Sequence, residues 1–274
     1  MVITVSTRNR VTSKIVRGFE SHRLRQKKHC NRSAFLTKCS KRIDREGVVE
    51  RQSFVKIYVA KTDALEAKET FARYYDKVSA QRREKIDHLR LPADRVRSLA
   101  VELLLQYALA ERGITQYTIR CGEHGKPYLA DHPEVYFNLS HAGDVVMCVV
   151  SDSEVGCDVE EIVEGREALA QRFFTPREAA EIAAQPTGEA KIALFYRYWT
   201  LKESFMKVTG RGMSLSPTAF EFELQADKIF IRHTVDDGTY EAREYDLLDG
   251  YRFAVCARSA AFFEPQWVDL TPDA

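Results

Sequence analysis

The sequence predicts an α+β protein built from two similar halves in one chain. Residues 54–60 alternate in the manner of a half-buried strand, and residues 93–112 carry apolar side chains at helical spacing. After a strand at 145–151 the pattern starts again with a strand at 155–160, followed by helices and further strands. This repetition favours a duplication with its joint at 151–154, where a ligand cleft is expected.

The remaining elements follow from caps, breakers and apolar spacing. Helices are expected at 64–76, 79–91, 165–174 and 189–208, and the helix at 93–112 lies between Pro92 and Gly113. Further strands are expected at 117–121, 135–139, 220–224, 228–232, 240–247 and 251–257. Thr175-Pro176-Arg177-Glu178 is a capping box with proline at the first helical position, so another helix starts there.

The net charge of +1 is the sum of two segments of opposite character. Residues 1–52 carry fourteen Lys/Arg against four Asp/Glu, a net of +10, whereas residues 53–274 carry 27 against 36, a net of −9. We therefore divide the chain into a basic extension at 1–52, an N-terminal half at 53–152, a C-terminal half at 153–258 and a tail at 259–274.

The basic extension shows no sustained apolar period, so it is expected to be disordered. Three other interpretations stay open: an arm for nucleic acid, an organelle transit peptide, and a segment upstream of the true translation start.

Composition excludes several classes of protein. The 45% hydrophobic fraction argues against wholesale disorder. No run approaches the roughly 18 apolar residues of a membrane-spanning helix, so no membrane association is expected. The six cysteines stand at least nine residues apart, which excludes a CxxC metal site, and Cys148 and Cys157 are expected to be buried thiols. Without a secretory signal either, a reducing, cytoplasmic setting is expected.

Two carboxylates lie in the expected strand at 155–160. Asp158 and Glu160 are two residues apart, so both side chains face the same side of the sheet. Carboxylates paired in this way repel unless they are solvated, protonated or holding a cation. A hard divalent ion such as Mg²⁺, with substrate phosphates completing its shell, would resolve the repulsion.

The long helix at 189–208 offers a third carboxylate. Glu203 and Lys207 are spaced i, i+4, one turn after Trp199. A surface ion pair is the simplest interpretation of that spacing. Trp199, which implies a half-buried face, and the second cation Lys202 favour a site for a metal and a phosphate instead.

Four motifs then occur in order, with Arg172-Phe173-Phe174 before the last: Gly125-Lys126-Pro127, Phe137-Asn138-Leu139-Ser140-His141, Gly156-Cys157-Asp158-Val159-Glu160 and Trp199-Thr200-Leu201-Lys202-Glu203-Ser204-Phe205-Met206-Lys207. In this order they resemble the 4′-phosphopantetheinyl transferases of the larger, surfactin-synthetase-activating type. The resemblance covers about residues 53–258. It implies two related α+β halves in a monomer, with coenzyme A in the cleft between them. The implied reaction transfers the 4′-phosphopantetheine arm to a serine hydroxyl of an apo acyl or peptidyl carrier protein and releases 3′,5′-ADP.

The resemblance also implies roles for single residues. Asp158, Glu160 and Glu203 would hold Mg²⁺, or Mn²⁺, together with the diphosphate of coenzyme A. Glu203 would be the base that takes the serine proton, and Lys207 the cation on the diphosphate. Lys202, on a different helical face, has only a supporting role.

The implied coenzyme A ligands are Arg82, Lys85, Arg97, Lys126, Pro127, Ser140, His141 and Lys207. His141, with Ser140 beside it, would bind the 3′-phosphate. Arg82 stands where the family has a lysine but keeps the charge. Lys126 and Pro127 would line the adenine side of the cleft.

Carrier proteins of this class are acidic, so a local basic surface is expected for docking. Arg166, Arg172 and Arg177, with Phe173 and Phe174, are the candidates, although the two phenylalanines could equally be core. Two other functions stay open: a coenzyme A-binding module without transfer activity, and a nucleic-acid binder that uses the extension. The charge of −9 on the folded part makes a nucleic-acid partner unexpected.

Overall fold

The structure, a computed structural model, describes residues 41–43, 49–51, 53–226, 228–258 and 260–272. Strands β1 (Lys41–Ile43) and β2 (Val49–Arg51) form an antiparallel pair where the sequence indicated no regular element. The rest of the basic extension lies outside the described residues. The predicted disorder of that part therefore stays a prediction. No helix of the described residues is long and apolar enough to cross a membrane.

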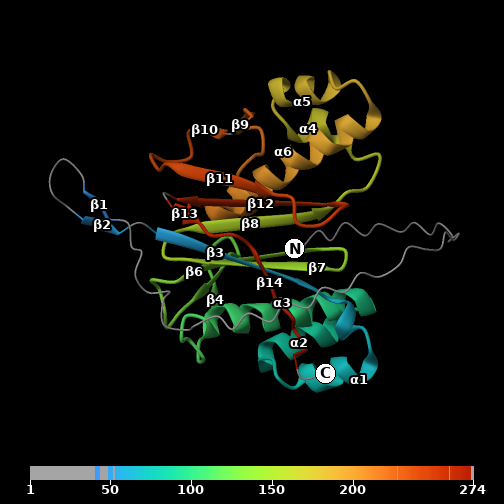
Figure 1. Ribbon diagram of the computed structural model, residues 1–274, viewed down its shortest axis with the longest axis vertical. Helices are drawn as coiled ribbons and strands as arrows, with labels where there is room; N and C mark the ends of the chain where they lie inside the picture. The colour runs from blue at the N-terminus through green and yellow to red at the C-terminus, as the bar shows by residue number, and fades with distance from the viewer. Residues whose placement is uncertain (1–40, 44–48, 52, 227, 259, 273–274) are drawn as a thin grey trace, which may run out of the picture. The chain divides into compact units, whose positions relative to one another are not determined.

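An antiparallel sheet forms the frame of the N-terminal half. Strand β3 (Ser53–Lys61) pairs with β7 (Val145–Ser151), which pairs with β6 (Tyr136–Ala142). Between β3 and β6 the chain forms η1 (Asp63–Leu65), α1 (Lys68–Tyr75), α2 (Ala80–His88), α3 (Pro92–Ala110) and a hairpin of β4 (Ile119–Cys121) and β5 (Pro127–Leu129). Helix α3 packs against this sheet (Figure 1).

The C-terminal half repeats this plan. Strand β8 (Val155–Glu161) pairs with β12 (Tyr251–Arg258), which pairs with β11 (Tyr240–Tyr245). Between β8 and β11 lie η2 (Glu167–Leu169), α4 (Ala170–Phe173), α5 (Pro176–Ala183), α6 (Gly188–Val208), η3 (Gly212–Ser214) and a hairpin of β9 (Phe220–Leu224) and β10 (Ile229–His233). In both halves the first strand pairs with the last, and the last with the one before it. This shared order confirms the predicted α+β duplication.

The predicted end signals of helices α3 and α5 are present. Pro92 is the first residue of α3, and Gly113, just after it, has a left-handed φ of 78°. At the start of α5 the Thr175 hydroxyl accepts from the Glu178 N–H, and the Glu178 carboxylate accepts from the Thr175 N–H at 2.9 Å. The capping box is therefore present as predicted.

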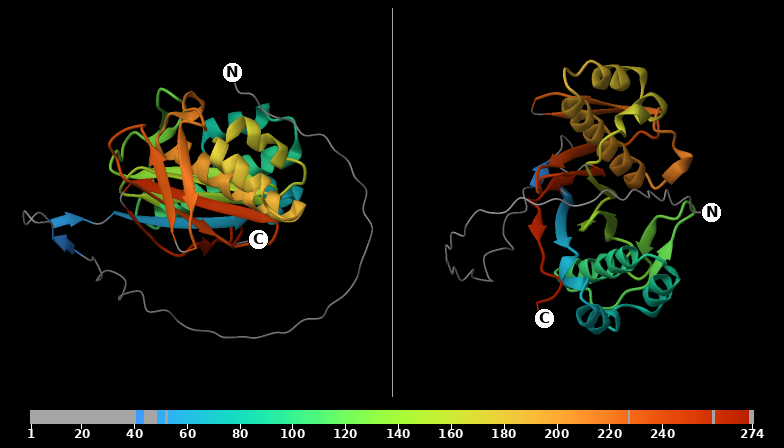
Figure 2. Two further views of the ribbon diagram at one scale, coloured as in Figure 1. Left: turned by 90° about the horizontal axis from the view of Figure 1, so that it is seen from above. Right: turned by 90° about the vertical axis from the view of Figure 1, so that its right-hand side faces the viewer.

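The tail of the chain returns to the N-terminal sheet. Strands β13 (Ala260–Phe262) and β14 (Gln266–Trp267) pair in parallel with β3, and the right-hand view of Figure 2 shows this segment running beside that strand. Val268 and Leu270 are buried in the core of the N-terminal half. Residues 259–274 were predicted only as a tail, and neither strand was expected from the sequence.

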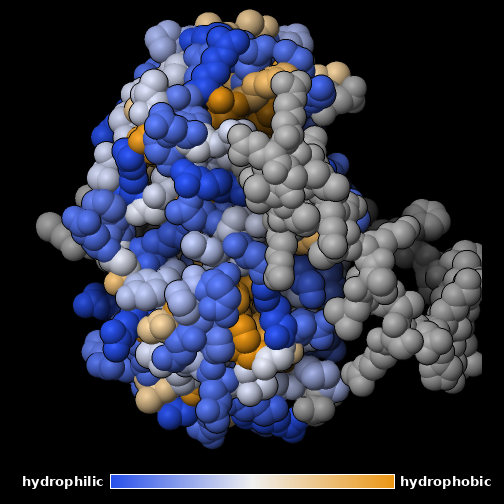
Figure 3. All heavy atoms as spheres, turned by 90° about the vertical axis from the view of Figure 1, so that its left-hand side faces the viewer, coloured by the Kyte–Doolittle hydropathy of each residue, from blue (hydrophilic) through white to orange (hydrophobic). Residues whose placement is uncertain are grey.

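Three apolar clusters form the core. One lies between the N-terminal sheet and its helices, and one lies around α6 in the C-terminal half. The third joins the sheets of both halves, with Val55, Ile57 and Val59 meeting Cys157 and Val159. The expected burial of the Cys148 and Cys157 thiols is confirmed. The face seen in Figure 3 is mostly hydrophilic, with only small separate hydrophobic areas.

Side chains, not backbone groups, connect the facing edges of β6 and β8. The Asn138 amide oxygen accepts from the backbone N–H of Cys157 at 2.8 Å, and the Ser140 hydroxyl accepts from that of Val159 at 3.3 Å. Lys126 donates to the carbonyl of Val155 at 3.0 Å. We call Lys126, Asn138 and Ser140 the side-chain seam, since they occupy the place that a neighbouring strand's backbone would take.

Candidate active site

Strand β8 presents two carboxylates opposite its core face. Cys157 and Val159 point into the cluster between the sheets, so the strand's two-residue alternation turns Asp158 and Glu160 toward α6. Asp158 is only 4% exposed. The predicted common face of the two carboxylates is therefore present, and a burial this deep requires partners for their charge.

Helix α6 approaches β8 closely at Gly156. A Cβ on Gly156 would overlap the carbonyl oxygen of Ser204 and the backbone nitrogen of Val208, so only glycine allows this contact. The approach brings Lys207 Nζ to 2.6 Å from Asp158 Oδ1. The simplest interpretation of the helical spacing was a surface ion pair of Lys207 with Glu203, and the sequence favoured a metal and phosphate site over it. Among the described residues Lys207 forms its ion pair with Asp158, across to the strand.

The Ser140 hydroxyl completes a small network with this ion pair. It donates to Asp158 Oδ1 at 2.9 Å and accepts from Lys207 Nζ at 3.0 Å and from the Val159 N–H. A hydroxyl has one proton and two lone pairs, and all three are used here. In this geometry the Ser140 hydroxyl holds Asp158 and Lys207 with its full hydrogen-bonding capacity, and its contact with coenzyme A stays a prediction.

The charges of the site are unbalanced toward acid. Burial and the charge of Asp158 raise the pKa of Glu160 to about 7, and the same two causes raise the pKa of Glu203. Burial alone would lower the pKa of Lys207, but Asp158 outweighs it and the net shift is upward. Burial first, and then the charge of Asp158, make Glu160 and Glu203 harder to ionise, and burial does the same to Asp158 itself despite Lys207 beside it.

The donor set fits a hard cation. Asp158 Oδ2 is buried and has no hydrogen-bond partner among the described residues. Carboxylate oxygens are the donors that Mg²⁺ and Mn²⁺ prefer. In the described part of the chain no three His, Cys, Asp or Glu side chains are already drawn together as a metal-binding group. Side-chain rotations of Glu160 and Glu203 toward Asp158 would be needed to form one.

These groups line one cavity of about 370 Å³, formed by Leu139, Ser140, His141, Asp158, Val159, Glu160, Trp199, Glu203 and Lys207. Trp199 donates its indole N–H to Glu160 at 3.1 Å and so connects α6 to β8 a second time. The sequence identified Trp199 only as a mark of a half-buried face. Its hydrogen bond was not visible from spacing within the helix.

His141 stands at the basic end of this cavity. The residue keeps some solvent exposure, but the protein around its ring removes part of the ring's hydration. This desolvation, followed by the charges of Arg97, Lys207 and Lys85, lowers the pKa of His141 to about 4. Each of the three neighbouring cations disfavours a further positive charge on the imidazole. A gathering of cations around a neutral imidazole suits a multiply charged anion.

The two arginines predicted for that anion are differently placed. Arg97 donates to the carbonyl of Gly143 at 3.0 Å and pairs with Asp94. Its positive charge also lowers the pKa of His141. Arg82 donates its Nε to Glu102 at 2.8 Å, and the side chains of that pair are 13% and 3% exposed. Arg82 therefore neutralises a buried carboxylate, and Lys85, which is exposed, is the cation of α2 that acts on His141.

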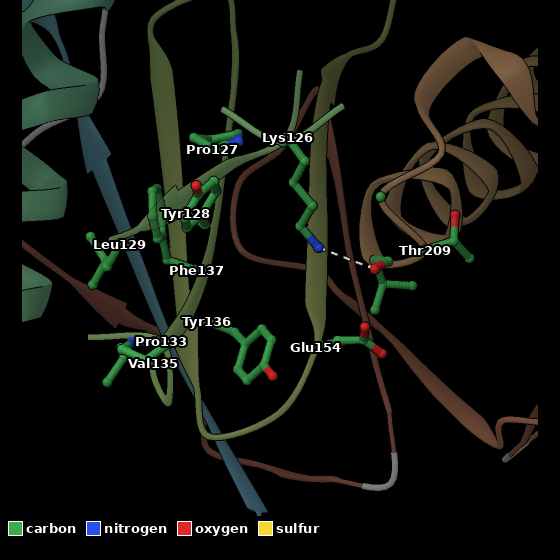
Figure 4. Close-up of a pocket in the computed structure, with 13 residues that line it drawn as sticks. Lys126, Pro127, Tyr128, Leu129, Pro133, Val135, Tyr136, Phe137, Glu154 and Thr209 are labelled. Carbon is green, nitrogen blue, oxygen red and sulfur yellow. Dashed lines mark hydrogen bonds between the residues drawn. The ribbon is translucent and has the colours of Figure 1, made fainter. Parts of the chain in front are cut away.

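Lys126 and Pro127 line a second pocket of about 360 Å³, together with Tyr128, Tyr136, Glu154 and Thr209 among others (Figure 4). The two pockets share no lining residue among those described. Lys126 donates to the carbonyls of Val155 and Val208, and burial lowers its pKa to about 8. Two backbone carbonyls therefore take up the Lys126 ammonium in this geometry, and the place of Lys126 and Pro127 on the adenine side of the cleft stays a prediction.

Lys202 has a structural place. Its Nζ is 2.9 Å from Glu178 and donates to the carbonyls of Pro217 and Phe220 inside the C-terminal half. Its side chain is 3% exposed and does not line the cavity. The supporting role in the site that the sequence suggested for Lys202 is therefore wrong.

Comparisons with known proteins agree with this geometry. The profile of the 4′-phosphopantetheinyl transferase superfamily matches residues 154–256, and that of the 4′-phosphopantetheinyl transferase N-terminal domain matches residues 66–153. A 4′-phosphopantetheinyl transferase of Bacillus subtilis is 34% identical over 190 residues, 68% of this chain and 84% of that protein. The 4′-phosphopantetheinyl transferase Sfp of Bacillus subtilis strain 168 is 30% identical over 77% of this chain and 95% of its own.

An α+β duplication whose cavity is lined by three carboxylates, together with relatives of this kind, defines a transferase. The chain belongs to the 4′-phosphopantetheinyl transferase superfamily, and the resemblance drawn from its motifs is confirmed.

Proposed function

We propose that the protein transfers the 4′-phosphopantetheine arm of coenzyme A to a serine hydroxyl of an apo acyl or peptidyl carrier protein, in a Mg²⁺-dependent reaction that releases 3′,5′-ADP. The observation that carries this proposal is the acidic cavity between the halves, with a cationic end at His141. Coenzyme A has a diphosphate and a 3′-phosphate, and the two ends of the cavity suit the two groups.

Asp158, Glu160 and Glu203 would hold the metal. When bound, Mg²⁺ or Mn²⁺ would screen the diphosphate and neutralise the three carboxylates. Lys207, already 2.6 Å from Asp158, would bind the diphosphate and stabilise the charge that develops on the departing 3′,5′-ADP. His141, with Arg97 and Lys85, would hold the 3′-phosphate.

Glu203 would take the proton of the carrier serine. Burial and Asp158 raise its pKa, which brings the carboxylate closer to the range useful for a base near neutral pH. The serine oxygen attacks the phosphorus that bears the pantetheine, the bond from this phosphorus to the ADP oxygen breaks, and that oxygen keeps the electron pair. The serine proton ends on Glu203.

The carrier would dock beside α4. Arg172 lies over the ring of Phe173 at 5.2 Å, and Arg166 is partly exposed. Arg177 is held by Glu181 and Glu221, so it is not available. Phe174 is 3% exposed and belongs to the core. Arg166 also lies 3.9 Å from the Glu160 carboxylate. Of the predicted patch, we retain Arg172 and Phe173.

We further propose that the protein acts as a cytoplasmic monomer. One chain already supplies both walls of the cavity, from β6 on one side and β8 and α6 on the other. The four described cysteines are all free thiols, as a reducing compartment would leave them.

Product analysis separates this proposal from a module that only binds coenzyme A. The full chain is incubated with coenzyme A, Mg²⁺ and an apo carrier, and with the same carrier after its acceptor serine is changed to alanine. Release of 3′,5′-ADP only with the serine carrier supports transfer. Binding of coenzyme A without such release from any carrier would favour the module, and affinity for nucleic acid at physiological salt would favour the basic-arm alternative.

A further inference from the structure

The side-chain seam binds every second residue of β8. In an antiparallel strand, alternate residues direct their backbone groups to the same edge. On β8 these are Val155, Cys157 and Val159, which bind Lys126, Asn138 and Ser140 respectively. The strand that bears Asp158 is thus held along its open edge by side chains of the other half.

Lys126 differs from the other two because it also binds α6. Its Nζ donates to the carbonyl of Val208 at 3.1 Å and to that of Val155 at 3.0 Å. Val208 is the last residue of α6, where carbonyls have no partner within the helix and a positive charge is favourable. One ammonium therefore joins the start of β8 to the end of α6.

This junction lies where the two elements touch most closely. Gly156 follows Val155 and has no room for a Cβ against α6. Lys207 is the residue before Val208. The distance between its Nζ and the Asp158 carboxylate therefore depends on the position of α6 along the direction of β8. A displacement of about 1 Å between reacting groups can lower a rate by about a hundredfold.

We propose that Lys126 is a positioning residue that fixes α6 on β8, and thereby Lys207 against Asp158, and that it does not bind coenzyme A through its charge. Two of its three N–H donors are used by carbonyls, and its pocket is separate from the one that holds the carboxylates. The effect on catalysis rests on the proposed function; the effect on the contact between α6 and β8 does not.

The two tryptophans allow that contact to be observed directly. Trp199 connects α6 to Glu160 of β8, while Trp267 is 43% exposed on β14. Trp267→Phe leaves Trp199 as the single reporter of the contact. In this background Lys126→Met is compared with Lys126→Arg, which keeps the charge and donors, and with Val78→Ala, which removes core apolar surface outside the seam.

For Lys126→Met we expect a changed Trp199 emission, kcat lowered by about tenfold or more, and a dissociation constant for coenzyme A within about twofold of the parent. Lys126→Arg should recover part of kcat, and Val78→Ala should change only stability. An unchanged emission and kcat with coenzyme A binding about tenfold weaker would overturn the proposal, as would no change in any of the three. If the parent transfers nothing, the proposed function fails, and the emission still tests the position of α6.

Discussion

Lys202 and Glu178 provide a stringent test of how α6 is anchored. Lys202 Nζ is 2.9 Å from Glu178 Oε2, and their side chains are 3% and 0% exposed. Glu178 also accepts from the backbone N–H groups of Thr175 and Phe222, each at 2.9 Å. Lys202→Met would fill a similar volume but leave the Glu178 carboxylate buried without its cation.

The expected loss of stability is large because the partner stays behind. Breaking a buried ion pair from one side typically lowers the free energy of unfolding by about 3–5 kcal/mol. At about 2–4 °C per kcal/mol for a domain of this size, the melting temperature should fall by about 6–20 °C. The double variant Lys202→Met with Glu178→Gln should lose clearly less than the sum of the single variants.

Urea unfolding followed by circular dichroism gives these free energies, and coincidence with fluorescence checks that the transition is two-state. The KM for coenzyme A should stay unchanged in Lys202→Met at a temperature where the variant is folded, because Nζ binds carbonyls of the C-terminal core. A loss below about 1 kcal/mol, or a raised KM with unchanged stability, would refute the reasoning.

Three further results are expected. His141→Ala should weaken binding of coenzyme A by tenfold or more but hardly alter binding of dephospho-coenzyme A, as measured by calorimetry; equal losses would exclude a 3′-phosphate contact. Burial and Asp158 raise the pKa of Glu160 to about 7 from its ordinary 4.5. Between pH 4.5 and about 7 the folded chain therefore binds more protons at this group than the unfolded chain does. The free energy of unfolding falls as the pH rises through this range. Mg²⁺ should therefore raise the melting temperature more at about pH 8 than at about pH 5.5, and a pH-independent rise would contradict the metal assignment. Arg172→Glu should raise the KM for an acidic carrier more than that for coenzyme A in steady-state kinetics, and equal effects would remove Arg172 from the docking surface.

Local patterns in the sequence were sufficient for much of this structure. The two-residue alternation around Asp158 and Glu160 predicted their common face, and the spacing of Thr175 and Glu178 predicted the cap of α5. Both features depend on neighbours within a few residues, where strand and helix periods are reliable.

Contacts between distant segments could not be predicted in this way. Lys207 forms its ion pair with Asp158, which is 49 residues away in the sequence, although Glu203 is only four residues away. Lys126 donates to the carbonyl of Val208, which is 82 residues away in the sequence. Arg82 has the charge expected of a phosphate ligand, yet Glu102 on the next helix takes its Nε. The partner of a charged side chain depends on which groups are buried beside it in the folded chain. Spacing along the sequence does not predict these neighbours.

The central claim is that the carboxylates of β8 and α6 support transfer to a carrier serine. Its most direct test is the intact mass of several apo carriers after incubation with the full chain, coenzyme A and Mg²⁺. The wild-type chain should add the mass of one phosphopantetheine to at least one carrier, and Asp158→Ala and Glu203→Gln should add none. No mass gain with any carrier, or a near-full gain with Asp158→Ala at saturating Mg²⁺, would contradict the account.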